Sequence, residues 1–168
     1  MTPAPSIRAA QDADLPALTA LYNHYVETNH CTFDATPLSV ELRRVWFDQH
    51  AEGGPHRLLV AVRGDALLGY ASSSAHRPKP GYLTSVETSV YLAPEAHGQG
   101  LGTRLYTELF GQLANEDVHR ALAGVALPNP ASVALHRRMG FSELGTFDEV
   151  GRKFDRYWSV QWFQRALP

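Results

Sequence analysis

Apolar residues recur at three- and four-residue spacing in four stretches of the chain, which predicts four amphipathic helices. The first follows Asp12 and Asp14, either of which can cap the start of a helix, and Ser39 can cap the second. Gly140 is expected to end the fourth, because glycine is common just after a helix C-terminus. The helices are expected over residues 15–25, 40–50, 101–113 and 131–139.

Shorter apolar or alternating runs predict strands between and after the helices. Arg63-Gly64-Asp65 separates two of these runs and is typical of the turn of an antiparallel hairpin. In the last run, Trp158, Val160 and Trp162 alternate with more polar neighbours. Because no repeat or linker divides the chain, residues 1–168 are expected to form one mixed α/β domain. The strands are expected over residues 7–10, 58–62, 66–71, 84–92, 121–127, 141–147 and 157–167.

The composition is that of an ordinary globular protein, and it limits the partners. Hydrophobic residues make up 44% of the 168 residues and charged residues 19%, which argues against disorder. The net charge of −2 gives no overall attraction to nucleic acid or to an anionic membrane. A single cysteine, Cys31, excludes a disulfide within the chain and fits a reducing compartment. Residues 1–10 lack the apolar core of a signal peptide and no run of 18 apolar residues occurs, so a soluble cytoplasmic protein is expected.

Three closely spaced glycines, Gly98, Gly100 and Gly102, stand between the strand expected at 84–92 and the helix expected at 101–113. Glycine permits a left-handed backbone and close approach of a ligand, and the unpaired N–H groups at a helix start attract anions. This arrangement suits phosphate, although a structural turn is the plainer alternative for glycines alone. The G-x-G-x-G spacing differs from both the dinucleotide fingerprint and the P-loop, so we predict a pyrophosphate cradle without a following lysine.

The segment from Val90-Tyr91-Leu92 through His97-Gly-Gln-Gly-Leu-Gly-Thr-Arg-Leu105 resembles the acetyl-coenzyme A (acetyl-CoA) signature of the GNAT superfamily of N-acetyltransferases. That signature is Q/R-x-x-G-x-G/A, and His97 stands where glutamine or arginine is usual. Further stretches are similar to one branch, the phosphinothricin N-acetyltransferase type, which includes the methionine sulfone and methionine sulfoximine acetyltransferases. These stretches span nearly the whole chain and are residues 22–28, 32–33, 77–82, 127–136, 140–141 and 150–154.

The resemblance implies the GNAT fold, a mixed central sheet in which two neighbouring parallel strands splay apart. It also implies acetyl-CoA as cosubstrate and a homodimer, with residues 151–158 near the subunit contact. The free edge of one splayed strand would pair with pantetheine, and the glycine loop would hold the pyrophosphate. Without the resemblance, that strand could be an ordinary paired one, and Asn129 a turn residue between two prolines. The cofactor-binding residues implied are Val90, Tyr91, Leu92, Gly98, Gln99, Gly100, Leu101, Gly102, Thr103 and Asn129.

Glu87 and His136 are the catalytic residues that the resemblance implies. An α-amino group is mostly protonated at neutral pH and has to lose a proton before it attacks a thioester. The resemblance assigns this base to Glu87, directly or through a water, whereas periodicity alone would place Glu87 on a solvent-facing side with Ser89 and Tyr91. His136 could protonate the leaving thiolate or help deprotonate the amine, although a helix-surface histidine is the plainer alternative. The division of roles between the two stays open.

Arg77, Lys79 and Tyr82 precede that strand in a proline-rich stretch, and the resemblance implies that they bind the acceptor, with Phe33 as an aromatic wall. Two cations can hold the carboxylate of an amino acid. A solvated basic loop and a core aromatic are the plainer alternatives. Cys31 has no neighbouring base in the sequence and is expected to be structural. No spacing typical of metal ligands occurs, so no metal is predicted.

Three functions remain open at this point. The leading one is transfer of acetyl from acetyl-CoA to the α-amino group of a small amino acid or analogue of the phosphinothricin, methionine sulfone or methionine sulfoximine type. The second keeps this chemistry with a polyamine or a protein N-terminus as acceptor, although a polyamine would favour an acidic pocket over Arg77 and Lys79. The third is a non-catalytic acyl-CoA sensor, which would keep the glycine loop without needing Glu87 and His136.

Overall fold

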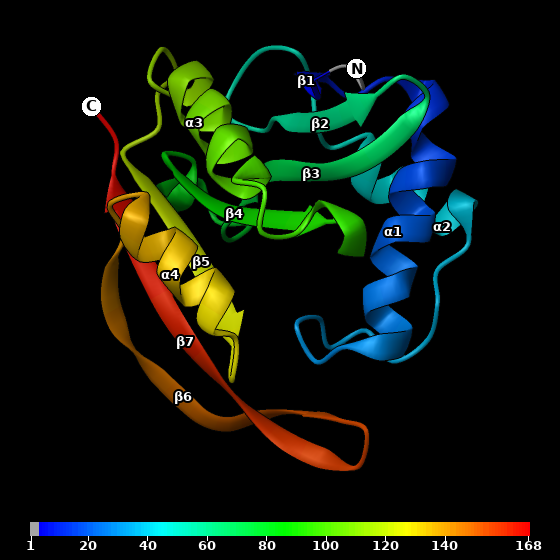
Figure 1. The fold of residues 1–168 in the computed structure, drawn as a ribbon. Coiled ribbons are helices and arrows are strands. Elements are labelled where there is room, and N and C mark those ends of the chain that lie inside the picture. The colour runs from blue at the N-terminus through cyan, green and yellow to red at the C-terminus, as the bar shows by residue number, and fades with distance from the viewer. Residues whose placement is uncertain (1–3) are drawn as a thin grey trace.

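The computed structural model describes residues 4–168, in which seven strands form a single mixed sheet (Figure 1). The order across the sheet is β1-β2-β3-β4-β5-β7-β6. Neighbouring strands are antiparallel except for β4 and β5, which run parallel. The strands are β1 (Ser6–Ala9), β2 (Leu58–Arg63), β3 (Ala66–Ala75), β4 (Ser85–Leu92), β5 (Arg120–Ala126), β6 (Ser142–Lys153) and β7 (Arg156–Ala166).

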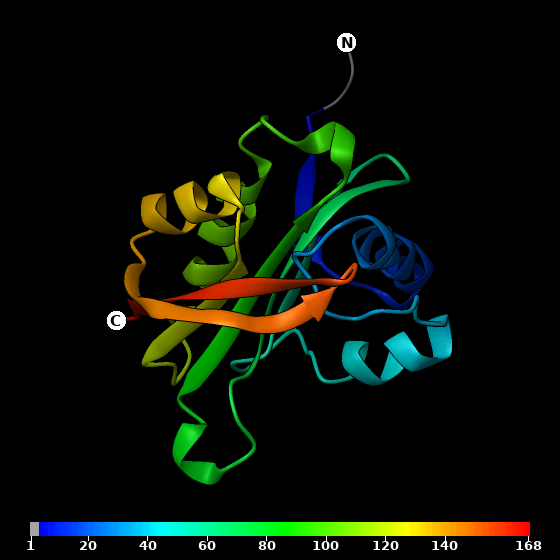
Figure 2. The same cartoon turned by 90° about the horizontal axis from the view of Figure 1, so that it is seen from below.

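Four α-helices of the described chain cover the two faces of the sheet (Figure 2). Helices α3 and α4 lie on one face, and α1 and α2 lie on the other. The core fills the space between the helices and the central strands, and its members include Leu18, Leu105, Leu109 and Phe163. Within residues 4–168, no helix is long and apolar enough to span a membrane. The helices are α1 (Leu15–Thr28), α2 (Val40–Phe47), α3 (Leu101–Leu113) and α4 (Pro130–Arg138).

Strands β4 and β5 are paired over only a short length. Residues 85–87 of β4 pair with residues 120–122 of β5, whereas β3 stays paired with β4 as far as Leu92. The two parallel strands therefore part directly after Glu87 and leave a V-shaped opening in the sheet. This confirms the splayed parallel pair that the sequence resemblance implies, and Glu87 lies at the apex of the V.

Two of the expected helix boundaries are confirmed, and a third is displaced. The Ser39 hydroxyl accepts a hydrogen bond from the Leu42 N–H and so caps α2. Gly140 follows α4 with a φ of 81°, as a C-terminal glycine should. Helix α2 ends at Phe47 rather than at residue 50, because the N–H groups of residues 49 and 50 bond to carbonyls three residues back and tighten the chain into a turn.

Asp14 occupies the N-cap position of α1, as one of the two expected candidates, but the capping hydrogen bond is absent. Residues 12–14 form a short 3-10 turn, and neither side chain bonds to the start of α1. The Asp14 carboxylate instead accepts from the Gln11 N–H at 2.7 Å and forms an ion pair with Arg8 at 2.6 Å. The hydrogen-bonded Arg8 guanidinium lowers the pKa of Asp14 from its usual value.

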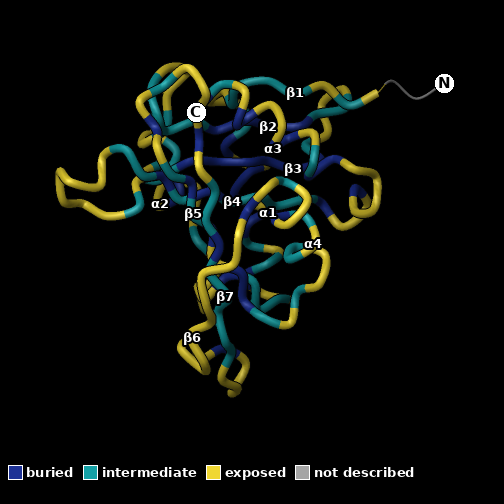
Figure 3. Tube along the Cα trace, turned by 90° about the vertical axis from the view of Figure 1, so that its left-hand side faces the viewer, coloured by how far each residue is buried: buried dark blue, intermediate teal, exposed yellow. Residues whose placement is uncertain are grey.

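The β6–β7 hairpin extends away from the body of the domain, and most of β6 is exposed (Figures 1 and 3). Strand β6 runs to Lys153, so the expected end at residue 147 is wrong. Between Phe147 and Gly151 the pairing register shifts, and Glu149 adopts a positive φ of 51°. This irregularity lets the strand resume beyond a segment whose sequence breaks the alternation.

Lys153 anchors the hairpin to the end of α1. Its side chain is buried, and Nζ donates to the backbone carbonyls of Tyr25 at 3.3 Å, Asn29 at 2.6 Å and Thr32 at 2.8 Å. Burial lowers the pKa of Lys153 from its ordinary value. Carbonyls at a helix C-terminus have no partner within the helix and attract a cation. One side chain of the hairpin thus satisfies the end of α1 and the loop after it.

Lys153→Met is expected to destabilise the fold, because methionine keeps much of the chain length and loses the three donors. Hydrogen bonds that involve a charged group contribute about 1.5–3 kcal/mol each to stability. Part of the lost free energy is regained if water molecules reach the freed carbonyls. A loss of that size should lower Tm by roughly 3–12 °C in a domain of this length. Calorimetry measures the change. Lys79→Met, at an exposed loop position, is the control and should leave Tm unchanged.

Candidate active site

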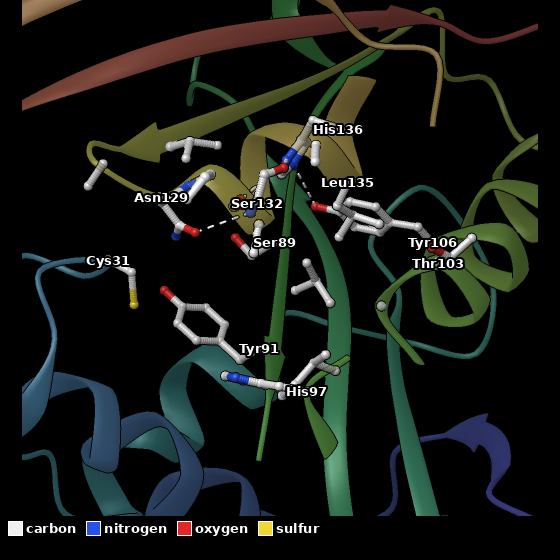
Figure 4. A pocket seen from close by; sticks show the side chains of 18 of the residues that line it. Cys31, Ser89, Tyr91, His97, Thr103, Tyr106, Asn129, Ser132, Leu135 and His136 are labelled. Atoms are coloured by element: carbon white, nitrogen blue, oxygen red, sulfur yellow. Dashed lines mark hydrogen bonds between the residues drawn. The ribbon is translucent and has the colours of Figure 1, made fainter. Parts of the chain in front are cut away.

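A pocket of about 630 Å³ lies where β4 and β5 part (Figure 4). Residues 88–92 of β4 and 124–126 of β5 form two of its walls. The glycine loop and helices α3 and α4 line it from one face of the sheet. Tyr25, His30 and Cys31, at the end of α1 and just beyond it, line it from the other. The V-shaped opening therefore gives a ligand contact with elements on both faces.

The glycine loop forms an open cradle at the start of α3. Gly98 and Gly100 both have a φ of 72°, in the left-handed region that other residues rarely adopt. A Cβ at either position would meet no atom within 4 Å, so the space above the loop is open. Gly100 is the N-cap of α3 and provides no side chain to bond the first N–H groups of the helix. Leu101 and Thr103 continue the pocket wall. Open amides at the positive end of a helix suit an anion.

Gly102 and Gln99 serve the loop in other ways. A Cβ on Gly102 would lie 3.2 Å from Leu135 Cδ2 and 3.7 Å from Leu92 Cδ1, so glycine here lets α3 pack closely against α4 and β4. The Gln99 side chain turns back and donates from Nε2 to the Glu95 carbonyl at 2.7 Å. Gln99 is absent from the pocket wall. Its backbone is the part of Gln99 that can join the cradle.

The β5-facing edge of β4 is free beyond the three residues paired with β5. Val90, Tyr91 and Leu92 lie on this edge and line the pocket, which excludes the alternative of an ordinary fully paired strand. The Tyr25 hydroxyl donates to the Leu92 carbonyl at 2.6 Å and so accepts from His97 Nε2 at 2.9 Å. Unpaired strand amides can donate to a ligand that lies along the edge.

Helix α4 is fixed at both ends. Asn129 Oδ1 accepts from the Ser132 N–H at 3.1 Å and caps the first turn (Figure 4). At the other end, the Gly140 N–H bonds to the carbonyl of Arg137 at 3.1 Å, and the Phe141 N–H bonds to the carbonyl of His136 at 3.0 Å. Asn129 also lines the pocket, so its cap of α4 does not exclude a contact with a ligand there.

His136 points from α4 into the pocket and is almost fully buried, with 4% of its surface exposed, so the helix-surface alternative is wrong (Figure 4). Its Nδ1–H donates to the Ser132 carbonyl at 2.8 Å, and Nε2 lies 3.2 Å from the Tyr106 hydroxyl. Burial lowers the pKa of His136, which favours the neutral ring. With the proton on Nδ1, Nε2 carries the lone pair and the Tyr106 hydroxyl donates to it. Tyr106 also lines the pocket. The sequence did not point to it, because a buried aromatic residue on an apolar helix is normally a core residue.

Glu87 lies at the apex of the V rather than within the pocket wall, which begins at the next residue, Thr88. Its side chain is 40% exposed, and Oε2 is 3.4 Å from Nδ1 of His76. The side chain therefore has the partial exposure that strand periodicity suggests. From the apex of the V, the Glu87 carboxylate could also reach a ligand that enters the opening between β4 and β5.

The residues implied for acceptor binding do not all come together. Arg77, Lys79 and Tyr82 are exposed in the loop between β3 and β4. The Arg77 guanidinium lies 5.9 Å from the centre of the Tyr82 ring, and the His76 ring meets Tyr82 edge-on at 5.7 Å. Glu87, His76, Tyr82 and Arg77 thus form a continuous chain of contacts. Sequence reasoning missed His76, because nothing in the sequence distinguishes it from the other seven histidines.

Phe33 and Cys31 lie apart from that chain of contacts. Phe33 packs against Gly151 of β6, where an added Cβ would overlap its ring. Cys31 lines the pocket, and burial raises the pKa of its thiol to about 11, which keeps it protonated and suits the structural role expected of it. In the part of the chain that the structure describes, no group of three or more His, Cys, Asp or Glu side chains is placed to hold a metal ion.

Residues 18–141 match the model of the acetyltransferase (GNAT) family. The chain belongs to the GNAT acetyltransferase family. It is 54% identical to a phosphinothricin N-acetyltransferase of Streptomyces coelicolor, over 96% of this chain and 95% of the relative. It is 36% identical to an L-methionine sulfoximine/L-methionine sulfone acetyltransferase of Pseudomonas paraeruginosa, over 96% and 94%.

Solved GNAT structures agree with this assignment. A GNAT superfamily phosphinothricin acetyltransferase from Sinorhizobium meliloti in complex with AcCoA matches with a TM-score of 0.91 and 34% identity, over 99% of this chain and 89% of that one. A ribosomal-protein-alanine N-acetyltransferase from Brucella melitensis also has a TM-score of 0.91, with 40% identity over 96% and 99%. The GNAT fold expected from the sequence is confirmed.

The GNAT site of this chain fits acetyl-CoA on its own geometry. The cradle of Gly98 and Gly100 leaves space for a phosphate, and the free edge of β4 leads from it into the V. A pocket of about 630 Å³ is large enough for an extended cosubstrate that occupies a groove. When bound, acetyl-CoA supplies an acetyl group activated as a thioester.

Gly100→Val is expected to weaken acetyl-CoA binding, because a β-branched residue strongly disfavours the left-handed φ that Gly100 adopts. Straightening this turn would redirect the open amides. We expect the KM for acetyl-CoA to rise at least about fivefold, since strain of about 1–3 kcal/mol is typical. Gly111→Val, at an exposed position in the last turn of α3, is the control for valine in this helix. Unchanged acetyl-CoA binding by calorimetry in Gly100→Val would contradict the cradle.

Proposed function

We propose that this protein transfers acetyl from acetyl-CoA to the α-amino group of a small amino acid or analogue, of the phosphinothricin, methionine sulfone or methionine sulfoximine type. The observation that carries the proposal is the position of Glu87 at the apex of the V, between the cosubstrate pocket and the Arg77 loop. The names of the two curated relatives support the same class of acceptor.

In the proposed reaction, the Glu87 carboxylate accepts a proton from the acceptor ammonium, directly or through a water, and frees the lone pair on nitrogen. The amides on the free edge of β4, at Val90 and Leu92, would donate to the oxygen that becomes negative when nitrogen attacks. Arg77 and Lys79 bind the acceptor carboxylate, and Tyr82 supports Arg77.

His136 has a second proposed role, at the leaving sulfur. Its Nε2 carries the lone pair of the neutral ring and accepts the hydrogen bond of the Tyr106 hydroxyl. Nε2 can therefore take the second proton that the acceptor nitrogen loses once its bond to the acetyl carbon has formed, and pass this proton to the sulfur as the C–S bond breaks. The hydrogen bond from Nδ1 to Ser132 holds the ring in place for this. Glu87 and His136 then act on opposite sides of the V, at the amine and at the sulfur.

A thiol-release assay over a panel of acceptors tests the function. We expect methionine sulfone, methionine sulfoximine or phosphinothricin to release coenzyme A thiol at saturating acetyl-CoA, and spermidine to release none. A peptide that begins with alanine tests the second candidate, which the name of the Brucella protein favours. Turnover of that peptide alone would move the acceptor class to protein N-termini. Tight acetyl-CoA binding without turnover of any amine would identify a sensor.

We also infer that the protein is a homodimer that forms through the β6–β7 hairpin, in the cytoplasm that its single cysteine suits. Contiguous exposed apolar surface on a domain of this size is typical of an interface. The hairpin exposes five large hydrophobic side chains, each at least half exposed: Leu144, Phe147, Val150, Phe154 and Tyr157.

Phe147→Glu is expected to dissociate this dimer, because a charge would be buried without a partner in each half of the interface. The dimer dissociation constant should rise at least about tenfold. Light scattering after size exclusion should then show the mass falling toward that of the monomer, 18.6 kDa. Leu42→Glu changes an exposed apolar residue on α2, away from the hairpin. It is the control and should leave the mass unchanged. A wild-type protein of monomer mass at all concentrations would contradict the inference.

A further inference from the structure

His76 is the point where three elements meet beside the predicted base. It follows the end of β3, and its Nδ1 is 3.4 Å from Glu87 Oε2 on β4. Its ring packs edge-on against Tyr82 of the same loop at 5.7 Å and against Trp162 of β7 at 6.4 Å. The His76 side chain is 15% exposed, against 40% for Glu87. The better-fixed member of the pair is therefore the histidine.

The hydrogen bond between the two side chains has one possible direction. A carboxylate can only accept, so Nδ1 of His76 carries the proton in this contact. That donor occupies Oε2 of Glu87, and within residues 4–168 no hydrogen bond reaches Oε1. Oε1 is thus the oxygen left for a proton from outside the protein. A half-exposed carboxylate without such a donor would sample several rotamers, which lowers the fraction of time spent in one orientation.

We propose that His76 is a positioning residue for acetyl transfer, which holds the Glu87 carboxylate through Oε2 and presents Oε1 to the acceptor amine. The inference rests on the proposed function of Glu87 as the base. Through Tyr82 and Arg77 the same histidine also links the base to the loop that would bind the acceptor carboxylate. The distance between the group that binds the carboxylate and the group that takes the proton is then set by one side chain.

Two variants separate the N–H donor from the ring. His76→Phe keeps an aromatic ring against Tyr82 and Trp162 and removes the donor. His76→Asn removes the ring and places an amide N–H near the position of Nδ1. We expect His76→Phe to lower kcat about tenfold, the lower end for a hydrogen bond to a charged group, with an unchanged KM for acetyl-CoA. His76→Asn should keep kcat within about threefold of the wild type and raise the KM for the acceptor.

The double variant His76→Phe/Glu87→Gln shows whether the histidine acts through the base. If it does, the double variant turns over no more slowly than Glu87→Gln alone, because there is no carboxylate left to position. Independent losses that multiply would overturn the inference. So would a wild-type kcat in His76→Phe, or an equal fall of kcat in His76→Phe and His76→Asn, which would assign the effect to ring packing.

Failure of the inference is distinct from failure of the proposed function. A wild-type enzyme that acetylates amino acids, together with a fully active His76→Phe, removes the role of His76 and leaves the function in place. A wild-type enzyme that acetylates none of the acceptors removes both. Far-ultraviolet circular dichroism and Tm of each variant confirm that the fold persists, and His76→Asn supplies the comparison if His76→Phe does not fold.

Discussion

Glu87→Gln is expected to lower turnover by roughly 10²–10⁴-fold, the range for removal of a general base. Glutamine has nearly the same shape as glutamate, and its amide cannot take a proton from an ammonium group. The position at the apex of the V, where the sheet opens, is kept because the backbone pairing of residues 85–87 with β5 does not depend on the side chain. Stopped-flow or continuous thiol release at saturating substrates measures the change.

The size of this loss should depend on pH. At high pH more of the acceptor amine is already neutral, so the variant needs the base less and the gap to the wild type should shrink. A defect of constant size across pH would point to a positioning role for Glu87. Glu95→Gln, at an exposed carboxylate in the short turn before the glycine loop, is the matched control, and a full rate is expected for it. Full activity of Glu87→Gln would remove Glu87 from the mechanism.

The sequence predicted the elements well where local spacing decides the structure. The leucine ridge of α3 and the alternation of β7 follow from burial of one helix stripe and one strand face. The ends of α2 and β6 could not be predicted. The apolar spacing does not show that the last turn of α2 tightens to hydrogen bonds three residues back, and the register shift near Glu149 depends on pairing with β7. Asp14 makes no capping hydrogen bond because its carboxylate is paired with Arg8 and with the Gln11 N–H instead.

The conformation of the glycine loop was predictable from the sequence, whereas several neighbours of the other candidate site residues were not. The glycine loop is local, so its positive φ values at Gly98 and Gly100 follow from residue type. His76 and Tyr106 became visible only when three-dimensional packing set them beside Glu87 and His136. Phe33 carries no contact with the other implied acceptor residues, because the loop after α1 brings it to the hairpin at Gly151.

We propose that the Arg77 loop decides which acceptor the enzyme prefers. Neither Arg77 nor Lys79 forms an ion pair with any residue of 4–168, and both are exposed, so both cations are free to bind a carboxylate. A carboxylate held at this loop fixes the α-amine, which is two bonds from the carboxyl carbon, near the apex of the V, and aminolysis requires such positioning. We therefore expect methionine sulfone to be acetylated and the matching decarboxylated amine to be acetylated far more slowly.

Arg77→Ala is expected to lower kcat/KM for the amino acid about 10–150-fold, because charge-assisted hydrogen bonds contribute about 1.5–3 kcal/mol each. The same variant should leave the rate with the decarboxylated amine and the KM for acetyl-CoA unchanged, so the preference for a carboxylate disappears. Lys79→Ala should cost less, since an ammonium lacks the planar fork that matches a carboxylate. Arg104→Ala, an exposed arginine on α3, is the control for loss of a surface cation. Equal rates for acid and decarboxylated amine in the unmutated enzyme would rule out the carboxylate clamp and turn the search for the acceptor to polyamines or peptides.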